Sequence, residues 1–306
     1  MKKLLIWLPG MLSMLAACTE AVEIPARAPE KQSPVRVELH LTTEQQAATR
    51  AMDENCIRDV NLYLYGDTEY HFYFPSVSSP LVFNVLPGNY RSYAIANAGQ
   101  DLGDKNAFKI QFYETAVDVM ESSDAIPMTD RGTLAVDGAG RCTPSSLRVT
   151  RSAAKIAYTI EVADAVAPSL RLRSVQFCNL PLTIRPFDSG SISSTVEANY
   201  YDGEAMPVGN ERRTAGTAYL FENLQGSVDT ITDQKDKCPE NAPSCATYLR
   251  ILAERSADKA LVEYIVYPGE NNTSDFNVRR NTWHNLELVI RGENEIDNRV
   301  LVYDGL

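Results

Sequence analysis

The chain has 306 residues, of which 29 are lysine or arginine and 40 are aspartate or glutamate, so its formal charge is −11 at neutral pH. This acidic balance argues against a protein that binds nucleic acid, because contacts to the phosphate backbone need clustered basic side chains. The length exceeds one typical domain and fits two domains of about 120 to 150 residues.

The first 18 residues have the layout of a bacterial export signal. Two lysines precede an apolar run from Leu4 to Leu15, and small residues then lead to Cys18. The run is too short to span a bilayer as a permanent helix. The sequence Leu-Ala-Ala-Cys that ends at Cys18 resembles the lipobox, in which the cysteine is acylated and becomes the N-terminus. We predict a lipoprotein signal peptide at residues 1–17; an ordinary secretory peptide with an incidental cysteine is the alternative.

Residues 18–34 are predicted to be a tether between the lipid and the folded part of the chain. Three prolines and no apolar periodicity indicate an extended segment. Acyl chains contribute about 0.8 kcal/mol per buried methylene, so lipid on Cys18 would hold the protein at a membrane without a spanning helix. Cleavage of the signal would remove two lysines and leave a formal charge of 27 − 40 = −13.

The first predicted strand looks removable. Its residues alternate strictly between apolar and polar from Val35 to Leu41, with Val37 and Leu39 between them on the apolar face. A polar loop follows, and Arg50 in this loop is an accessible site for a trypsin-like protease. Cutting there would release the strand and leave a groove that a strand from another subunit could fill by β-augmentation. A permanent strand and an ordinary surface arginine are the alternative.

Short strands with turn residues between them follow along the chain. Tyrosines and β-branched residues at spacings of about 8 to 12 residues are typical of a β-sandwich. These strands are predicted at 57–65, 70–74, 81–86 and 90–97, and one helix is predicted at 106–120. Gly138 to Pro144 is polar and glycine-rich, and a new series of strands starts at Leu147. We therefore place one sandwich at residues 35–145 and a second at 146–306.

Five cysteines remain after Cys18, so at least one has no disulfide partner within the chain. Cys238 and Cys245 bracket a turn-rich stretch and could form a local disulfide in an exported protein. Their spacing and neighbours do not resemble a zinc site. Cys178 is predicted to be a buried apolar side chain on a strand.

No catalytic or metal-binding motif stands out in the sequence. The three histidines are scattered, at His40, His71 and His284, and none lies near a serine or cysteine in a nucleophile-elbow context. Acidic residues such as those near Glu293 lack the spacing of a calcium loop. We therefore predict no enzyme activity, no metal and no cofactor.

Segments along the mature chain carry a family resemblance. The lipobox and the strand followed by Thr49-Arg50-Ala51 come first. The others are Ile57–Tyr65, Leu86–Tyr90, Ala96–Gly99, Arg151–Ile156, Tyr219–Gly226, Tyr267–Asn271 and Asp275–Asn281. Each motif is degenerate by itself, but in this order they resemble the fimbrillin superfamily, the lipoprotein precursors of Bacteroidia-type (type V) fimbriae.

The resemblance implies an all-β fold with two transthyretin-like β-sandwich domains in tandem. It also implies transit to the outer membrane as a lipoprotein and polymerisation by strand exchange after an arginine-specific protease cuts a loop. Carried over to this chain, Arg50 is the cleavage position, Ala51 the new N-terminus, and Val35 to Leu41 the strand removed. The C-terminal run with Val300, Leu301, Val302 and Tyr303 is the candidate donor strand.

Two main classes of function and a third, less favoured one follow from the sequence. The first is a fimbrial subunit in a stalk, tip or anchor role, whose partners are other subunits, the outer membrane through its lipid, and a host or bacterial surface ligand. The second is a surface glycan-binding lipoprotein. Its candidate sugar platforms are Tyr63, Tyr65, Tyr70, Tyr73 and Trp283, although tyrosines in alternating strands are more often core residues. A hydrolase is the third reading.

Overall fold

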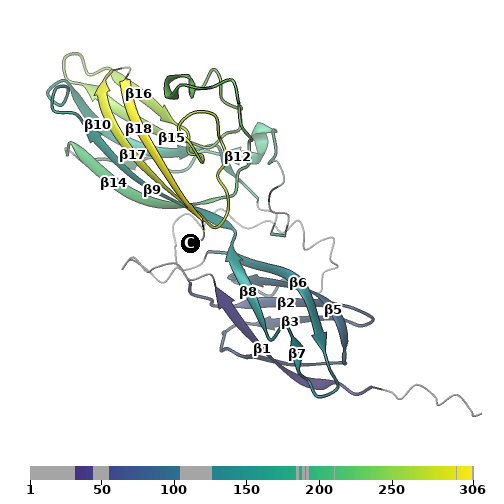
Figure 1. Cartoon of the computed structure of the whole chain (residues 1–306). Helices are drawn as coiled ribbons and strands as arrows, with labels where there is room; N and C mark the ends of the chain where they lie inside the picture. The colour runs from purple at the N-terminus through teal and green to yellow at the C-terminus, as the bar shows by residue number, and fades with distance from the viewer. Residues whose placement is uncertain are drawn as a thin grey trace, which may run out of the picture. The chain divides into compact units, whose positions relative to one another are not determined.

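The computed structural model of the chain describes residues 32–43, 55–103, 126–183, 186–187, 190, 193–209, 211–293 and 295–304 (Figure 1). The predicted signal peptide, Cys18, Arg50, Ala51 and the helix predicted at 106–120 lie outside these residues. Within the described ranges the regular structure is β-strand apart from two short 3-10 helices, η3 (Glu197–Asn199) and η4 (Gln234–Asp236). For the described residues the predicted all-β fold is confirmed.

The first half of the chain forms one eight-stranded sheet, in the order β3-β2-β5-β6-β8-β1-β4, with β7 paired to β6. Neighbouring strands are antiparallel except for β1 and β8, which are parallel. The strands are β1 (Val35–Thr43), β2 (Val60–Tyr65), β3 (Glu69–Phe74), β4 (Leu81–Val85), β5 (Gly88–Ala96), β6 (Met128–Val136), β7 (Cys142–Thr143) and β8 (Ser146–Arg151).

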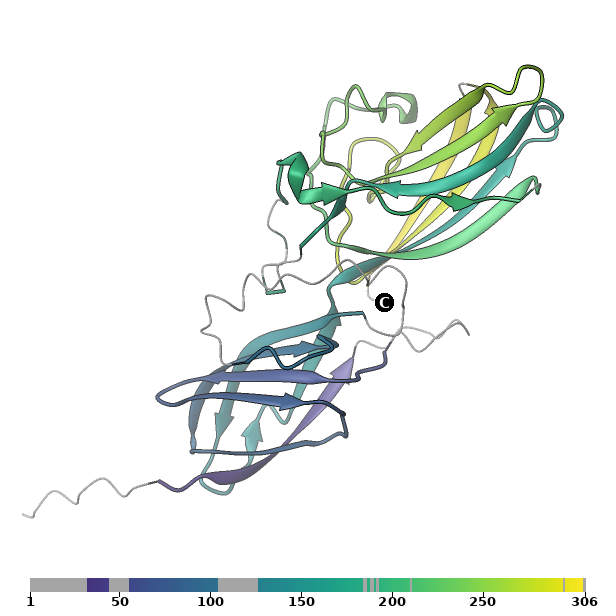
Figure 2. The same ribbon diagram turned by 180° about the vertical axis from the view of Figure 1, so that it is seen from behind.

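The second half forms two four-stranded sheets and a two-stranded ribbon (Figure 2). One sheet has the order β13-β10-β15-β16, the other β14-β9-β17-β18, and β11 pairs with β12. Only β9 and β17 are parallel among these described pairs. The strands are β9 (Ala153–Val162), β10 (Leu170–Cys178), β11 (Leu180–Pro181), β12 (Tyr200–Tyr201), β13 (Met206–Pro207), β14 (Arg213–Phe221), β15 (Tyr248–Arg255), β16 (Leu261–Val266), β17 (Thr282–Gly292) and β18 (Glu295–Asp304).

The two largest of five hydrophobic clusters in the described part of the chain result from the alternation of side chains along these strands, because successive residues of a strand point to opposite faces of its sheet. The first core contains Leu62 and Leu134, which are 0% exposed, and draws on β1, β2, β4, β5, β6 and β8. The second contains Ile156, Ile251 and Leu286, and so lies between the two four-stranded sheets. None of the helices in the described ranges is long and apolar enough to cross a membrane.

Candidate functional site

The first strand lies inside its sheet and not at an edge. Residues Val35–Leu39 of β1 pair with β4, and His40–Thr43 pair with β8 on the other side. Figure 1 shows β1 beside β8. We call the space that β1 fills the β1 slot. The parallel pairing joins β1 to a strand more than a hundred residues later in the chain, so the slot has walls from distant parts of the sequence.

The side chains of β1 follow the predicted alternation. Val37 and Leu39 are 0% exposed in the first core, and Val35 and Leu41 are partly buried beside them. The side chains between these four positions are exposed. Full burial of a valine or leucine side chain is worth roughly 1.5 to 3 kcal/mol. An empty β1 slot would therefore expose a costly apolar surface.

A tight turn at Asp137–Arg141 covers part of β1 on the side away from β4. Gly140 in this turn has φ = 79°, and a Cβ atom built on it would lie 2.1 Å from the carbonyl oxygen of Arg36. The thiol of Cys142 donates to the carbonyl oxygen of Glu38 over 3.3 Å. The sequence analysis treated this glycine-rich stretch only as a boundary between domains, and it missed the contact with β1.

The candidate donor strand is part of a long C-terminal hairpin. Val300 to Tyr303 belong to the ten-residue strand β18, whose register with β17 places Val300 opposite Leu286 and Tyr303 opposite Trp283. The paired run is thus longer than the sequence suggested. β18 has a single neighbour in its sheet, so among the described strands it is an edge strand. Its departure would break one ladder of backbone hydrogen bonds.

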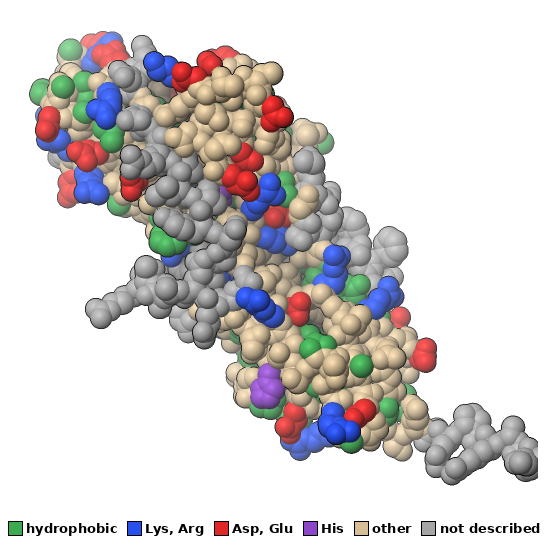
Figure 3. Space-filling view, viewed as in Figure 1, with side chains coloured by type: hydrophobic (Ala, Val, Ile, Leu, Met, Phe, Trp, Pro, Cys, Tyr) green, Lys and Arg blue, Asp and Glu red, His purple; other side chains and the backbone are tan. Residues whose placement is uncertain are grey.

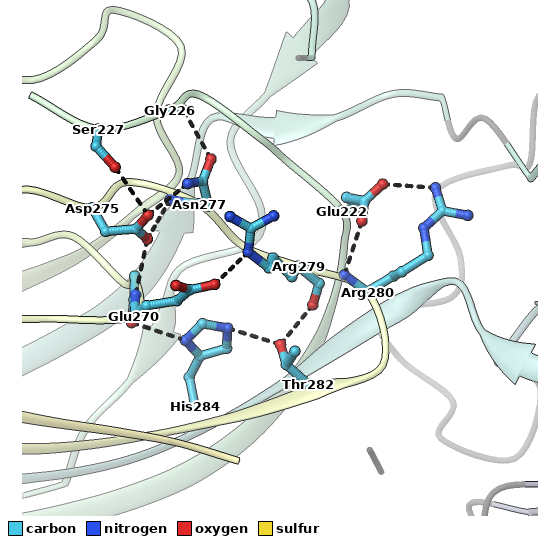
Figure 4. Close-up of polar contacts among 11 residues, drawn as sticks. Glu222, Gly226, Ser227, Glu270, Asp275, Asn277, Arg279, Arg280, Thr282 and His284 are labelled. Atoms are coloured by element: carbon cyan, nitrogen blue, oxygen red, sulfur yellow. Dashed lines mark hydrogen bonds and ion pairs between the residues drawn. The ribbon is translucent and has the colours of Figure 1, made fainter. Parts of the chain in front are cut away.

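A buried polar network explains two of the degenerate sequence motifs (Figure 4). The Asp275 carboxylate accepts hydrogen bonds from the backbone N–H groups of Glu270 (2.9 Å) and Asn277 (3.0 Å) and from the Asn277 amide (2.6 Å). The Asn277 amide oxygen accepts from the Gly226 N–H at 2.8 Å. A Cβ atom on Gly269 would lie 2.1 Å from the Asp275 carbonyl oxygen. These residues hold the loop that leads into β17.

His284 at the start of β17 belongs to the same network. Its Nδ1 lies 3.3 Å from the Gly269 carbonyl oxygen, its Nε2 lies 3.0 Å from the Thr282 hydroxyl, and its side chain is fully buried. Burial lowers the pKa of His284 to about 4, and the positive charge of Lys237 lowers this pKa further. The hydrogen bond to Gly269 and the negative charge of Asp275 oppose the decrease without cancelling it. The residue serves to position the strand.

The buried His284 predicts a dependence of stability on pH. Because its folded-state pKa lies below the unfolded value of 6.5, the unfolded chain binds the proton first as the pH falls. We expect the free energy of unfolding to decrease between about pH 6.5 and pH 4, by roughly 3 kcal/mol. Urea unfolding at several pH values measures this effect. A His284→Gln variant should lose this part of the pH dependence, and an unchanged slope would contradict the assignment.

The two cysteines of the predicted local disulfide are free thiols. Cys245 is buried, 1% exposed, whereas Cys238 is partly exposed in its loop, where the Asn241 amide lies 3.5 Å from its sulfur. The two thiols thus occupy different surroundings, and the expected bridge is not formed. Cys178 is fully buried on β10, as predicted.

The tyrosines proposed as sugar platforms are largely taken up by packing. Tyr63 and Tyr65 are 1% and 6% exposed, and Tyr63 stacks on His71. Tyr70 stacks on Phe72. The Lys155 ammonium lies 5.2 Å from the centre of the Trp283 ring. Packing thus removes Tyr63 and Tyr65 from the candidate sugar platforms, whereas Tyr70, Tyr73 and Trp283 are half-buried.

No group of residues in the described ranges has the geometry of a metal site. His40 is exposed on β1, His71 has its Nε2 3.0 Å from the Asn61 amide oxygen, and His284 belongs to the buried network. The three histidines are therefore held by separate strands. On the face shown in Figure 3, acidic and basic side chains are interspersed without a field of one sign.

Residues 218–288, less than a quarter of the chain, match a family model described as a domain of unknown function, DUF4906. The matched stretch contains the network around Asp275. No curated protein sequence matches the chain.

Solved structures of bacterial fimbrial and cell adhesion proteins share the fold. A putative cell adhesion protein from Bacteroides eggerthii is 13% identical, with a TM-score of 0.61 over 92% of this chain and 98% of that one. A fimbrilin (FimA) from Porphyromonas gingivalis is 13% identical, with a TM-score of 0.60 over 89% and 98%. The tip fimbrial protein Mfa3 from P. gingivalis, truncated at its C-terminus, is 13% identical, with a TM-score of 0.54 over 89% and 100%. The predicted resemblance to the fimbrillin superfamily is thereby confirmed at the level of the fold.

Proposed function

We propose that the chain is a non-enzymatic subunit of a fimbrium (pilus) that assembles by exchange of β-strands. The observation that carries the proposal is the position of β1. It lies between two other strands, fills the core with Val37 and Leu39, and is followed after Thr43 by the stretch that contains Arg50. The likeness of the fold to fimbrial and cell adhesion proteins supports this reading.

The proposal includes the route to the cell surface and the division into domains. Acylation of Cys18 tethers the exported precursor to the outer membrane, and the chain then forms two transthyretin-like sandwiches, for which the sequence predicted the bounds 35–145 and 146–306. The two largest hydrophobic cores support two sandwiches, and because Leu147 and Val149 of β8 belong to the first core, the division lies between Arg151 and Ala153 and not after residue 145. The partners are other fimbrial subunits, and in a tip role also a host or bacterial surface ligand.

The donor in this scheme is the C-terminal strand with Val300, Leu301, Val302 and Tyr303. An edge strand can leave its sheet with the loss of only one ladder of backbone hydrogen bonds, and the apolar run Val300 to Tyr303 of β18 offers apolar side chains for the buried positions of the slot. A stalk subunit uses both the slot and the donor strand, a tip subunit uses only the slot, and an anchor keeps its lipid and its β1.

Cleavage of the purified precursor tests the proposal. An arginine-specific protease should produce a new N-terminus at Ala51, and the cleaved protein should form oligomers that resist SDS. An Arg50→Gln variant should stay uncut at this site and monomeric. The proposal fails for a stalk subunit if the wild-type precursor is cut at Ala51 and yet remains monomeric at every concentration. Mass spectrometry of the N-terminus on cells distinguishes the roles: acylated Cys18 indicates an anchor, and Ala51 an assembled subunit.

A further inference from the structure

The β1 slot has one wall that is not a strand. Beyond the residues paired with β8, the carbonyl groups of Arg36 and Glu38 face the Asp137–Arg141 turn and β7. Gly140 approaches the first carbonyl so closely that a Cβ atom would overlap it, and the Cys142 thiol donates to the second. At this place the slot therefore has room for the backbone of a strand and for nothing larger.

The turn is held in a fixed conformation by its own hydrogen bonds. The Asp137 carboxylate accepts from the backbone N–H groups of Ala139 (2.9 Å) and Arg141 (2.9 Å) and from the Arg141 Nε (2.8 Å). The Gly140 N–H donates to the Asp137 carbonyl oxygen at 3.0 Å. A turn closed by this many bonds cannot easily move outward when a side chain is added at its tip.

We infer that Gly140 determines which strands the β1 slot accepts, because it sets the gap between the turn and the backbone of the bound strand. The inference rests on the proposed function, in which a second strand takes the place of β1. Gly140 is a positioning residue in this scheme: it has no side chain and makes room for the carbonyl groups of the incoming strand.

The geometry also defines the chemistry of the partner. The partner is an extended segment of another subunit that places apolar side chains at the fully buried positions of Val37 and Leu39. The positions of Val35 and Leu41 are only partly buried, so the type of side chain is less restricted there. Its carbonyl groups must lie where those of Arg36 and Glu38 lie now, so a bulge or a proline-induced bend at these two positions is excluded.

Uptake of a peptide by the cleaved protein tests this inference. The full-length precursor is cut with an arginine-specific protease and mixed with a fluorescent peptide that has the sequence of residues 33–43, and uptake is followed by anisotropy and gel filtration. We expect uptake by the wild type and about tenfold or more weaker uptake by Gly140→Ala, since overpacking a fixed site is strongly unfavourable.

Two control variants distinguish the clash between a Cβ atom at position 140 and the Arg36 carbonyl oxygen from other effects of adding a methyl group to a glycine. Gly138→Ala lies in the same turn, with no atom within 4 Å of the added Cβ, and Gly99→Ala has a similar positive φ of 71° with equally open surroundings. Both should take up the peptide like the wild type. Equal uptake by Gly140→Ala and Gly138→Ala would overturn the inference. A wild type that takes up no peptide would instead remove the proposed strand exchange.

A measurement on the wild type covers the case in which Gly140→Ala does not fold. Because the Cys142 thiol lies against the Glu38 carbonyl, β1 should protect it from alkylation in the intact precursor. Mass spectrometry should show faster alkylation of Cys142 in cleaved protein freed of β1, and the added peptide should restore the protection. If Cys142 is alkylated at the same rate with and without β1 or the peptide, the proposed contact between Cys142 and the strand in the slot is wrong.

Discussion

Joining β1 to β4 by a disulfide should abolish assembly while cleavage at Arg50 proceeds. Arg36 and Asn84 are directly opposite each other in the antiparallel pair, and both side chains are exposed. Opposite residues in such a pair have Cβ atoms about 4.5 to 5.5 Å apart, close to what a disulfide needs. In the oxidised Arg36→Cys, Asn84→Cys variant the cut strand remains covalently attached to its slot. No donor strand can then enter, and SDS-resistant oligomers should be absent.

Reduction provides the internal control. Dithiothreitol should release the cut strand and restore oligomers to the wild-type level, whereas the single variant Arg36→Cys should assemble under both conditions. The N-terminus at Ala51, read by sequencing, confirms that the protease has acted in each sample. Oligomers that form equally well in the oxidised double variant would show that β1 does not have to leave, and the strand-exchange proposal would be wrong.

Side-chain alternation accounts for the parts of the fold that the sequence predicts. The segments Val35 to Leu41 and 81–86 alternate clearly, and both are strands with buried apolar positions. Alternation says which face of a strand is buried, but it does not say which strand lies beside it. The parallel pairing of β1 with β8 could not be read from either segment.

The residues that the sequence analysis missed act through their backbone or through contacts between distant segments. Gly140 matters because of the carbonyl of Arg36, a hundred residues earlier, and no local pattern signals this contact. Asp275 and Asn277 were noted as part of a motif, but acidic and amide side chains are common in surface loops. Asp275 and Asn277 are buried because their loop packs against the segment that contains Gly226, which lies about fifty residues earlier in the chain, and the sequence gives no sign of this contact. The predicted disulfide between Cys238 and Cys245 is not formed, since proximity in sequence does not decide whether two thiols share the same surroundings: Cys245 is buried and Cys238 is partly exposed.

Removal of the Arg280 side chain should strongly lower the stability of the second half of the chain. Arg280 precedes β17 and its Nη2 lies 2.8 Å from the carboxylate of Glu222, which follows β14; the two side chains are 10% and 9% exposed. The Arg280 N–H also donates to Glu222 at 3.2 Å, and its Nη1 donates to the Pro186 carbonyl oxygen at 2.8 Å. The pair thus links two strands that lie on either side of β9.

Arg280→Ala should lower the free energy of unfolding by about 3 to 5 kcal/mol, because it leaves the Glu222 carboxylate buried without its counter-charge. Urea unfolding measures the loss. Arg212→Ala is the matched control, since its ion pair with Asp164 is exposed and should be worth about 1 kcal/mol or less. The double variant Glu222→Leu, Arg280→Met should recover much of the stability, because it removes both charges and keeps the volume. If the double variant is as unstable as Arg280→Ala, the lost packing and the bond to Pro186, and not the unpaired charge, account for the effect.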